Sequence, residues 1–442
     1  MSRLVGGMGL AVVVSKLKGK SLLSGSAIYL FANVLNAAVP FVLLPILTRY
    51  LNPAEYGEVA MFQTLIAALA ALVGLNVHGA ASRKYFDSDA RGRGLGLFVG
   101  SCFQVLLIST LVVLVLVAAT HEALSGWLGI PTAWLYLAVG VSVAGFVVNM
   151  RLGQWQIRRQ AKAYGALQVA QSLAIMLLSI GFVVALSWGA AGRVWAQFLA
   201  VACLSFVAFG LLCKDRLVHF LFWRPDYIKE ALAFGVPLIP HVVGAFLLFS
   251  VDRFVINSEF GLKAAGLYMV AVQVSLVLGV LFDSVNKAYV PWLFERLARG
   301  DALESHQLVK FSYLYFLLLL SLALLAFWLG PIAVRLLAGE QYVAAGMLVG
   351  WLALGQSFKG MYFTVTGYIF YTKKTSILSL ITIASGAINL VGLLIGIELF
   401  GLQGAAIAFT FAMACQFILS WFFAAKVHPM PWLSIFSRNK VA

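Results

Sequence analysis

The feature that most limits what this chain can fold into is a series of long, uninterrupted apolar runs. A helix needs about 20 apolar residues to cross the hydrocarbon core of a bilayer, and the runs at 105–119 and 316–329 lack the alternation of a barrel strand. Backbone groups in lipid must pair within their own segment, so the spans should be helices. The runs predict about twelve spans, at 23–48, 57–79, 95–118, 133–150, 164–187, 193–213, 231–253, 264–286, 311–329, 346–370, 377–397 and 404–425.

Composition excludes a soluble enzyme. Of the 442 residues, 62% are hydrophobic and 11% are charged, whereas a soluble domain carries about 25% charged residues. Folded in water, such a chain would expose large apolar patches. Cys102, Cys203, Cys213 and Cys415 lie in or beside spans without metal-ligand spacing, so no metal site is expected.

Basic residues alternate with the spans. If the N-terminus is cytoplasmic, 25 Lys and Arg residues fall in inside segments, 5 fall outside, and Lys359 lies within a span. Cytoplasmic loops are enriched in these residues, so the pattern predicts both ends inside and a multi-pass protein of the bacterial inner membrane. The net charge of +15 is spread over seven inside segments, so no nucleic-acid partner is expected.

The chain also predicts an internal repeat of six spans plus six. The opening spans of the two halves carry Pro40 and Pro45, and Pro237 and Pro240. Interrupted helices at corresponding positions point to a transport site between halves, although prolines are common in membrane helices. An even number of spans per half gives a parallel repeat around a central cavity. The predicted parts are a cytoplasmic tail at 1–20, a first lobe at 21–213, a cytoplasmic linker at 214–230, a second lobe at 231–425 and a cytoplasmic tail at 426–442.

Several short motifs stand in order along nearly the whole chain. They are Gly25-Ser26-Ala27 with Asn33, Pro40 and Pro45, Arg49-Tyr50-Leu51, Glu55-Tyr56-Gly57, Asp252-Arg253-Phe254, Ala265-Gly266-Leu267-Tyr268, Gly339-Glu340-Gln341-Tyr342, Asn389-Leu390 and Gly401-Leu402-Gln403-Gly404. Together they resemble the motifs of the polysaccharide-transporter family, which contains the O-antigen and exopolysaccharide repeat-unit flippases of the multidrug/oligosaccharidyl-lipid/polysaccharide exporter superfamily. The middle of the chain, at about 95–230, matches only in its span pattern.

The resemblance implies two six-helix bundles around a cavity that opens alternately to each side. It implies a substrate that is an oligosaccharide on a polyprenyl pyrophosphate, part of lipopolysaccharide or exopolysaccharide synthesis, moved from the cytoplasmic to the periplasmic leaflet. It also implies contact with polysaccharide polymerase and chain-length proteins. No cofactor is expected, and the choice between a proton and a sodium gradient stays open.

Lys359 is the strongest candidate for binding the pyrophosphate. It lies in the middle of the tenth predicted span, and Gln356 shares its helical face. A charge within a span costs free energy and usually faces a cavity, where an ammonium can hold a phosphate. The alternative is a lysine that snorkels to the interface or pairs with an acid.

Three arginines at span ends are further cavity candidates. Arg49 and Arg253 occupy corresponding positions in the two halves and would line the exit or serve as structural ion pairs. Arg83 follows the second span and would meet the incoming pyrophosphate, or it is an ordinary positive-inside charge.

Other polar residues within spans leave their roles open. Asn33 and Asn36 share one face of the first span and would contact sugar hydroxyls or join helices. His78 and His241 are candidates for proton coupling, with packing as the alternative. Asp283 is a candidate for ion coupling and is also spaced to pair with a lysine four residues later.

Two other functions compete with the flippase. An ion-coupled multidrug or small-molecule exporter of the same fold would need acids in the first span, which has none before Glu55. A membrane polymerase or glycosyltransferase would need a large outside loop with paired acids, and the predicted loops are short. No glycine-rich loop with a lysine for cradling ATP phosphates occurs.

Overall fold

Most of the described residues are helical. The computed structural model describes residues 28–432 except 30, 88–92 and 220, with no strand among them. The predicted tail 1–20, the start of the first span and residues 433–442 lie outside this part. The helices of the first half are Phe31–Tyr50, α2 (Pro53–Leu69), η1 (Val73–Asn76), α3 (Val77–Lys84), α4 (Gly94–Leu128), α5 (Thr132–Ile157), α6 (Ala161–Ile180), η3 (Gly181–Ala185) and α7 (Gly189–Lys214). Those of the second half are α8 (Pro225–Gly235), η4 (Val236–Leu238), α9 (Ile239–Phe249), α10 (Val251–Arg299), α11 (Ala302–Ala338), η5 (Glu340–Ala345), α12 (Gly346–Tyr371), α13 (Ser376–Phe400) and α14 (Leu402–Val427).

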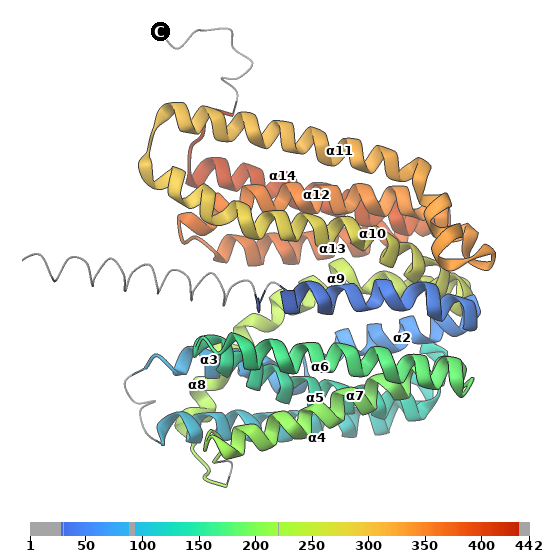
Figure 1. The fold of residues 1–442 in the computed structure, drawn as a ribbon, viewed down its shortest axis with the longest axis vertical. Helices are drawn as coiled ribbons and strands as arrows, with labels where there is room; N and C mark the ends of the chain where they lie inside the picture. The colour runs from blue at the N-terminus through green and yellow to red at the C-terminus, as the bar shows by residue number, and fades with distance from the viewer. Residues whose placement is uncertain (1–27, 30, 88–92, 220, 433–442) are drawn as a thin grey trace, which may run out of the picture.

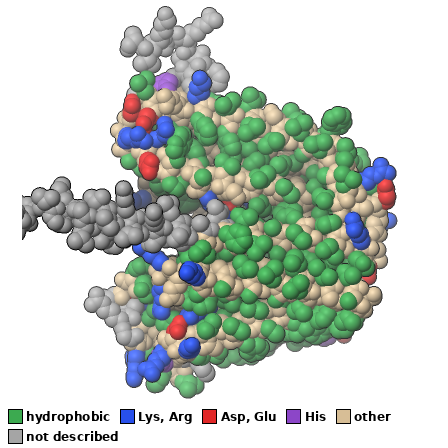
Figure 2. All heavy atoms as spheres, in the orientation of Figure 1, with side chains coloured by type: hydrophobic (Ala, Val, Ile, Leu, Met, Phe, Trp, Pro, Cys, Tyr) green, Lys and Arg blue, Asp and Glu red, His purple; other side chains and the backbone are tan. Residues whose placement is uncertain are grey.

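The helices form two bundles, with the first helix drawn between them (Figure 1). In one bundle α5 packs on α7 and α4, and in the other α12 packs on α14, α11 and α10. Charged side chains gather at the two ends of the helices and leave a hydrophobic band between them (Figure 2). Within the described part, ten helices are long and apolar enough to cross a membrane. The chain is therefore a multi-pass membrane protein.

Two predicted spans do not pass that test as single helices. The second is bent by 59° between α2 and α3, and the pair passes only when taken together. The tenth, α12, has 26 residues, enough for about 39 Å of helix, but it is more polar than the others because it contains Gln356 and Lys359. The count of twelve crossings and the orientation in the membrane stay predictions.

The seventh predicted span is divided between the bundles. α8 packs on α3 and α4, whereas α9 packs on α13. At η4 the helix contains Pro237, and a proline removes a backbone hydrogen bond of the helix. Pro225–Phe249 nevertheless passes as one membrane-length helix, as Phe31–Tyr50 of the first span does. The predicted interruption of both opening spans and the predicted lobe and linker boundaries stay predictions.

Several helix ends differ from the predicted span ends. α10 continues to Arg299 and α11 begins at Ala302, so both extend well past 286 and 311. The polar residues beyond the predicted span ends include good helix formers such as Glu295, so the helices continue past the apolar runs. An apolar run marks the part of a helix that faces lipid and does not mark where the helix ends. The turn between the fifth and sixth spans comes slightly earlier than predicted, because α7 already begins at Gly189.

The two bundles meet backbone to backbone where α2 passes α10. A Cβ added to Gly57 would lie 1.9 Å from the carbonyl oxygen of Leu262, and one added to Gly266 would lie 1.9 Å from that of Pro53. Small residues allow this approach, which favours van der Waals packing between helices in lipid.

Asn52 starts α2 with a capping box. Its side chain accepts a hydrogen bond from the backbone N–H of Glu55 at 3.0 Å, and the Glu55 carboxylate accepts one from the Asn52 N–H at 2.9 Å.

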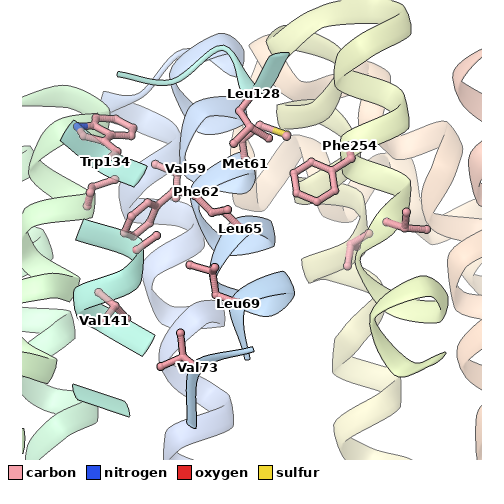
Figure 3. Close-up of a cluster of buried hydrophobic side chains, with 14 of the residues drawn as sticks. Val59, Met61, Phe62, Leu65, Leu69, Val73, Leu128, Trp134, Val141 and Phe254 are labelled. Atoms are coloured by element: carbon pink, nitrogen blue, oxygen red, sulfur yellow. The ribbon is translucent and has the colours of Figure 1, made fainter. Parts of the chain in front are cut away.

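A hydrophobic core surrounds this contact (Figure 3). Phe62 of α2 packs edge-on against Trp134 of α5, with ring centroids 6.2 Å apart. Met61 points toward Phe254 of α10, whose ring stacks on Trp127 at 5.2 Å. The core is therefore continuous from the first bundle to the start of α10.

We expect Gly266→Ala to destabilise the protein, because the added methyl group must push α2 and α10 apart. Overpacking of this kind costs about 1–3 kcal/mol. Thermal unfolding of the purified protein in detergent measures the effect as a lower melting temperature. Gly126→Ala in α4 is the matched control, since nothing lies within 4 Å of its added Cβ; an equal loss in both variants would contradict the role of the glycine contact.

Candidate functional site

A cavity of about 230 Å³ lies where the first helix, α10 and α12 meet. It brings together residues that are more than 300 positions apart in sequence. Its polar and charged lining consists of Asn33, Asp283, Ser284, Lys287 and Lys359. Three of the ten predicted site residues, Asn33, Asp283 and Lys359, therefore line one cavity.

Lys359 lies at the middle of α12 and points into this cavity. Its Nζ is 4.8 Å from the ring centroid of Phe249 and 5.8 Å from that of Phe363, which are cation–π distances. Among the described residues, no ion pair or hydrogen bond reaches this ammonium group. Its charge is thus held between aromatic rings and is free to meet an anion.

The acid of the cavity is already paired. Asp283 Oδ2 lies 2.6 Å from Lys287 Nζ, one helical turn along α10, so the predicted i,i+4 pair is present. Both side chains are a little under half exposed, and such pairs contribute at most about 1 kcal/mol. Asp283 also interacts electrostatically with Lys359. With two ammonium groups and one carboxylate, the cavity lining carries one positive charge in excess.

The two asparagines of the first helix are engaged with α6. Asn33 Oδ1 accepts a hydrogen bond from Gln168 Nε2 at 3.0 Å, and Asn36 Oδ1 accepts one from Ser172 Oγ at 2.7 Å. Both therefore join helices, which was one of their two predicted roles. Asn33 also lines the cavity, and its Nδ2 can donate to a bound group.

Gln356 lies behind the cavity wall. Its side chain is buried against Gly279 of α10, where an added Cβ would sit 2.6 Å from its Oε1. This oxygen has no hydrogen-bond partner in the described part of the chain. Gly279 lines the cavity on its other side, so Gln356 supports the wall and does not reach the interior.

The predicted arginines and histidines lie elsewhere. Arg253 is buried at the start of α10, where its Nη1 donates to the Phe249 carbonyl at 3.0 Å and lies 4.0 Å from Asp252. Arg49 and Arg83 are exposed at helix ends. His241 is half-buried, and its Nδ1 has no partner among the described residues. His78 lines a separate cavity in the first bundle.

Sequence reasoning missed a set of hydrogen bonds between the two halves. Tyr56 Oη donates to Gln273 Oε1 at 2.5 Å, and Tyr342 Oη donates to the Leu51 carbonyl at 2.8 Å. Gln341 Nε2 donates to the Thr48 carbonyl at 2.7 Å. The sequence did contain a signal for these bonds, because Tyr56, Gln341 and Tyr342 belong to the motifs quoted above. In the structure these three motif residues hold the two halves together.

A family model described as polysaccharide biosynthesis protein matches residues 22–297, more than half of the chain. The chain belongs to this family. The predicted resemblance is confirmed.

Two curated relatives extend the match. A Haemophilus influenzae protein described as an uncharacterized membrane protein is 26% identical over 384 residues, covering 84% of this chain and 89% of its own length. The succinoglycan biosynthesis transport protein ExoT of Rhizobium meliloti is 25% identical over 354 residues, covering 75% of this chain and 65% of its own.

Solved structures share the fold. The lipid II flippase MurJ in an inward closed conformation gives a TM-score of 0.73 at 14% identity, covering 91% of this chain and 87% of that one. An inward-facing MATE family transporter of the MOP superfamily gives 0.64 at 16% identity, covering 88% and 94%. At these identities the likeness shows the fold alone, and it confirms the predicted all-helical membrane architecture.

We expect Asp283→Asn to strengthen the binding of inorganic pyrophosphate to the purified protein by about threefold, equivalent to about 0.7 kcal/mol. The variant removes the negative charge of the cavity and leaves Lys287 and Lys359 unopposed. Isothermal titration calorimetry in nanodiscs measures the change. Asp226→Asn, at an exposed position in α8, is the control. Weaker binding in Asp283→Asn would mean that the carboxylate orients Lys287 for the anion.

Proposed function

We propose that the protein is a flippase that moves a polyprenyl-pyrophosphate-linked oligosaccharide, an O-antigen or exopolysaccharide repeat unit, from the cytoplasmic to the periplasmic leaflet of the bacterial inner membrane. The observation that carries the proposal is the ammonium group of Lys359, which lies in a cavity at the middle of α12 and has no ion-pair or hydrogen-bond partner among the described residues. Membership of a polysaccharide biosynthesis family supports it.

The chemistry of the cargo matches this cavity. A sugar head and a pyrophosphate cannot cross hydrocarbon unaided, because each polar group would lose its hydrogen bonds to water. A cationic, polar space inside the protein replaces water for the head, while the polyprenyl tail stays in lipid. A lysine acts as a point charge for phosphate, and Asn33 adds an amide donor beside it.

The size of the cavity supports alternating access. At about 230 Å³ it is smaller than the usual range of small-molecule sites, about 300–1,000 Å³. An oligosaccharide head requires the two bundles to separate before it enters. The inter-half hydrogen bonds of Tyr56, Gln341 and Tyr342 gather at the end that the charge pattern predicts to be periplasmic. We therefore assign this conformation to the state that is closed on the periplasmic side.

The second candidate is an ion-coupled multidrug or small-molecule exporter. Its support is the shared fold with a MATE family transporter and the presence of Asp283 in the cavity. The excess positive charge of the lining argues against a cationic drug. A proton or a sodium gradient is the proposed energy source in either case, and the proposed partners of the flippase are the polymerase and chain-length proteins of the same polysaccharide.

We expect Lys359→Met to slow leaflet translocation of the lipid-linked oligosaccharide in reconstituted vesicles by about tenfold or more, which corresponds to about 1.4 kcal/mol of lost phosphate stabilisation. Methionine keeps the length and the packing against Phe249 but removes the charge. Lys359→Arg keeps the charge and should recover much of the rate.

The control is Lys310→Met, which removes an exposed lysine of α11 outside the cavity. The flippase assignment fails if the wild-type protein does not move the lipid-linked oligosaccharide. It also loses its physical basis if Lys359→Met and Lys310→Met change the translocation rate by the same factor. Faster export of a drug cation by Lys359→Met, without any oligosaccharide transport, would favour the second candidate.

A further inference from the structure

The first bundle contains a second cavity of about 300 Å³, enclosed by α2, η1, α3, α5, α6 and α7. Among the described residues that line it, none is Asp, Glu, Lys or Arg. The polar side chains that face it are amides, one hydroxyl and one imidazole. They are Asn76, His78, Ser142, Asn149, Gln171 and Gln197.

Most of these groups are unused by the protein itself. Within the described residues, the side chains of His78, Asn149 and Gln171 make no hydrogen bond, and Asn76 Nδ2 is buried without a partner. Gln197 hydrogen-bonds to Gln63, and Ser142 Oγ donates to the Ala138 carbonyl at 2.8 Å. Buried polar groups are normally satisfied, so a ligand in this cavity would satisfy the Asn76 amide and meet the open side chains of His78, Asn149 and Gln171 beside it.

The backbone is strained where it supplies part of this cavity. Leu75 has φ 45° and ψ 35°, and Asn76 has φ 57° and ψ 14°, both in the left-handed region. A leucine rarely adopts this conformation, which costs free energy and tends to persist at functional sites. The resulting 59° bend between α2 and α3 lies beside Asn76 and His78, both of which line the cavity.

We propose that this cavity is the binding site for the sugar head of the cargo, distinct from the cationic cavity that binds the pyrophosphate. The inference rests on the proposed flippase function. Amide side chains both donate and accept, as sugar hydroxyls require, and the rings of Phe146 and His78, with centroids 5.6 Å apart, offer apolar faces beside them. An uncharged lining suits an uncharged polyhydroxylated group, and its described residues supply no carboxylate to pair with a drug cation.

The contact between the first helix and α6 connects the linings of the two cavities. Gln168 and Ser172 of α6 hydrogen-bond to Asn33 and Asn36 of the first helix, and Asn33 lines the cationic cavity. Gln171, between them on α6, lines the neutral cavity. One side of this helix contact therefore faces the pyrophosphate site, and the next residue along α6 faces the sugar site. A lipid-linked head bound at both would span the contact.

The test uses single cysteines in a background whose four native cysteines are replaced by alanine. Gly145→Cys places a thiol in the neutral cavity, where an added Cβ meets nothing within 4 Å. Ala37→Cys places one in the cationic cavity. Gly210→Cys is the control on α7, in open space outside both cavities. The rate of labelling by N-ethylmaleimide is measured in nanodiscs with polyprenyl pyrophosphate and with the lipid-linked repeat unit extracted from cells that lack this protein.

We expect polyprenyl pyrophosphate to slow labelling of the Ala37→Cys variant only, and the sugar-bearing lipid to slow labelling of both the Ala37→Cys and Gly145→Cys variants by about fivefold or more. If neither lipid protects the Ala37→Cys variant, the proposed pyrophosphate site is wrong. If both protect it and the Gly145→Cys variant stays open or is never labelled, the sugar site is wrong and the flippase function stands.

A second measurement separates direct contact from a change of conformation. Adding Gln171→Leu to the Gly145→Cys variant removes an amide of the lining, and we expect about tenfold more sugar-bearing lipid to be needed for half-maximal protection. Gln156→Leu, an exposed amide on α5, is the matched control and should leave that concentration unchanged. The sugar site is wrong if the Gly145→Cys variant and its Gln171→Leu and Gln156→Leu derivatives all need the same concentration of sugar-bearing lipid for half-maximal protection.

Discussion

The close approach of α2 and α10 is the contact on which the rest of the structure depends. Gly57 and Gly266 leave no space for a side chain, so the backbones of the two halves touch directly. Lipid tails provide no hydrophobic driving force between helices, and tight packing of small residues replaces it. The bonds from Tyr56 and Tyr342 form only when the helices are this close. The same contact therefore determines both the closed end of the protein and the position of α10, which supplies Asp283 and Lys287 to the cavity.

The approximate places of most membrane helices could be predicted because hydropathy reports directly on contact with lipid. The bend between α2 and α3 could not, since Leu75 has no sequence signal for the left-handed region and only its surroundings hold it there. The ends of α10 and α11 were missed for a related reason: a helix continues into water when its residues are good helix formers. Hydropathy therefore reports the length of the part of a helix that crosses lipid, and the helix itself can be longer.

The candidate site was predictable where a residue is costly in lipid. Lys359, Asp283 and Asn33 stand out because each places a charge or an amide within a span, and they line one cavity. Arg253 was equally conspicuous in the sequence, yet its guanidinium donates a hydrogen bond to the Phe249 carbonyl and pairs with Asp252. The neutral cavity escaped notice because its four amides lie on four separate segments and carry no charge. Only the packing of the helices shows that they converge.

The division of the seventh span bears on how the bundles can separate. Glu230 of α8 is held by both carboxylate oxygens to the buried Lys84 of α3, at 2.9 Å each. Asn389 of α13 donates to the Leu247 carbonyl of α9 at 2.8 Å. α8 is thus fixed to one bundle and α9 to the other, and breaking the ion pair would leave the buried Lys84 without this carboxylate, which is costly. Between them lies η4, where Pro237 leaves the backbone short of a hydrogen bond. Separation of the bundles requires a change in the angle between α8 and α9, and this short turn is where the chain resists that change least.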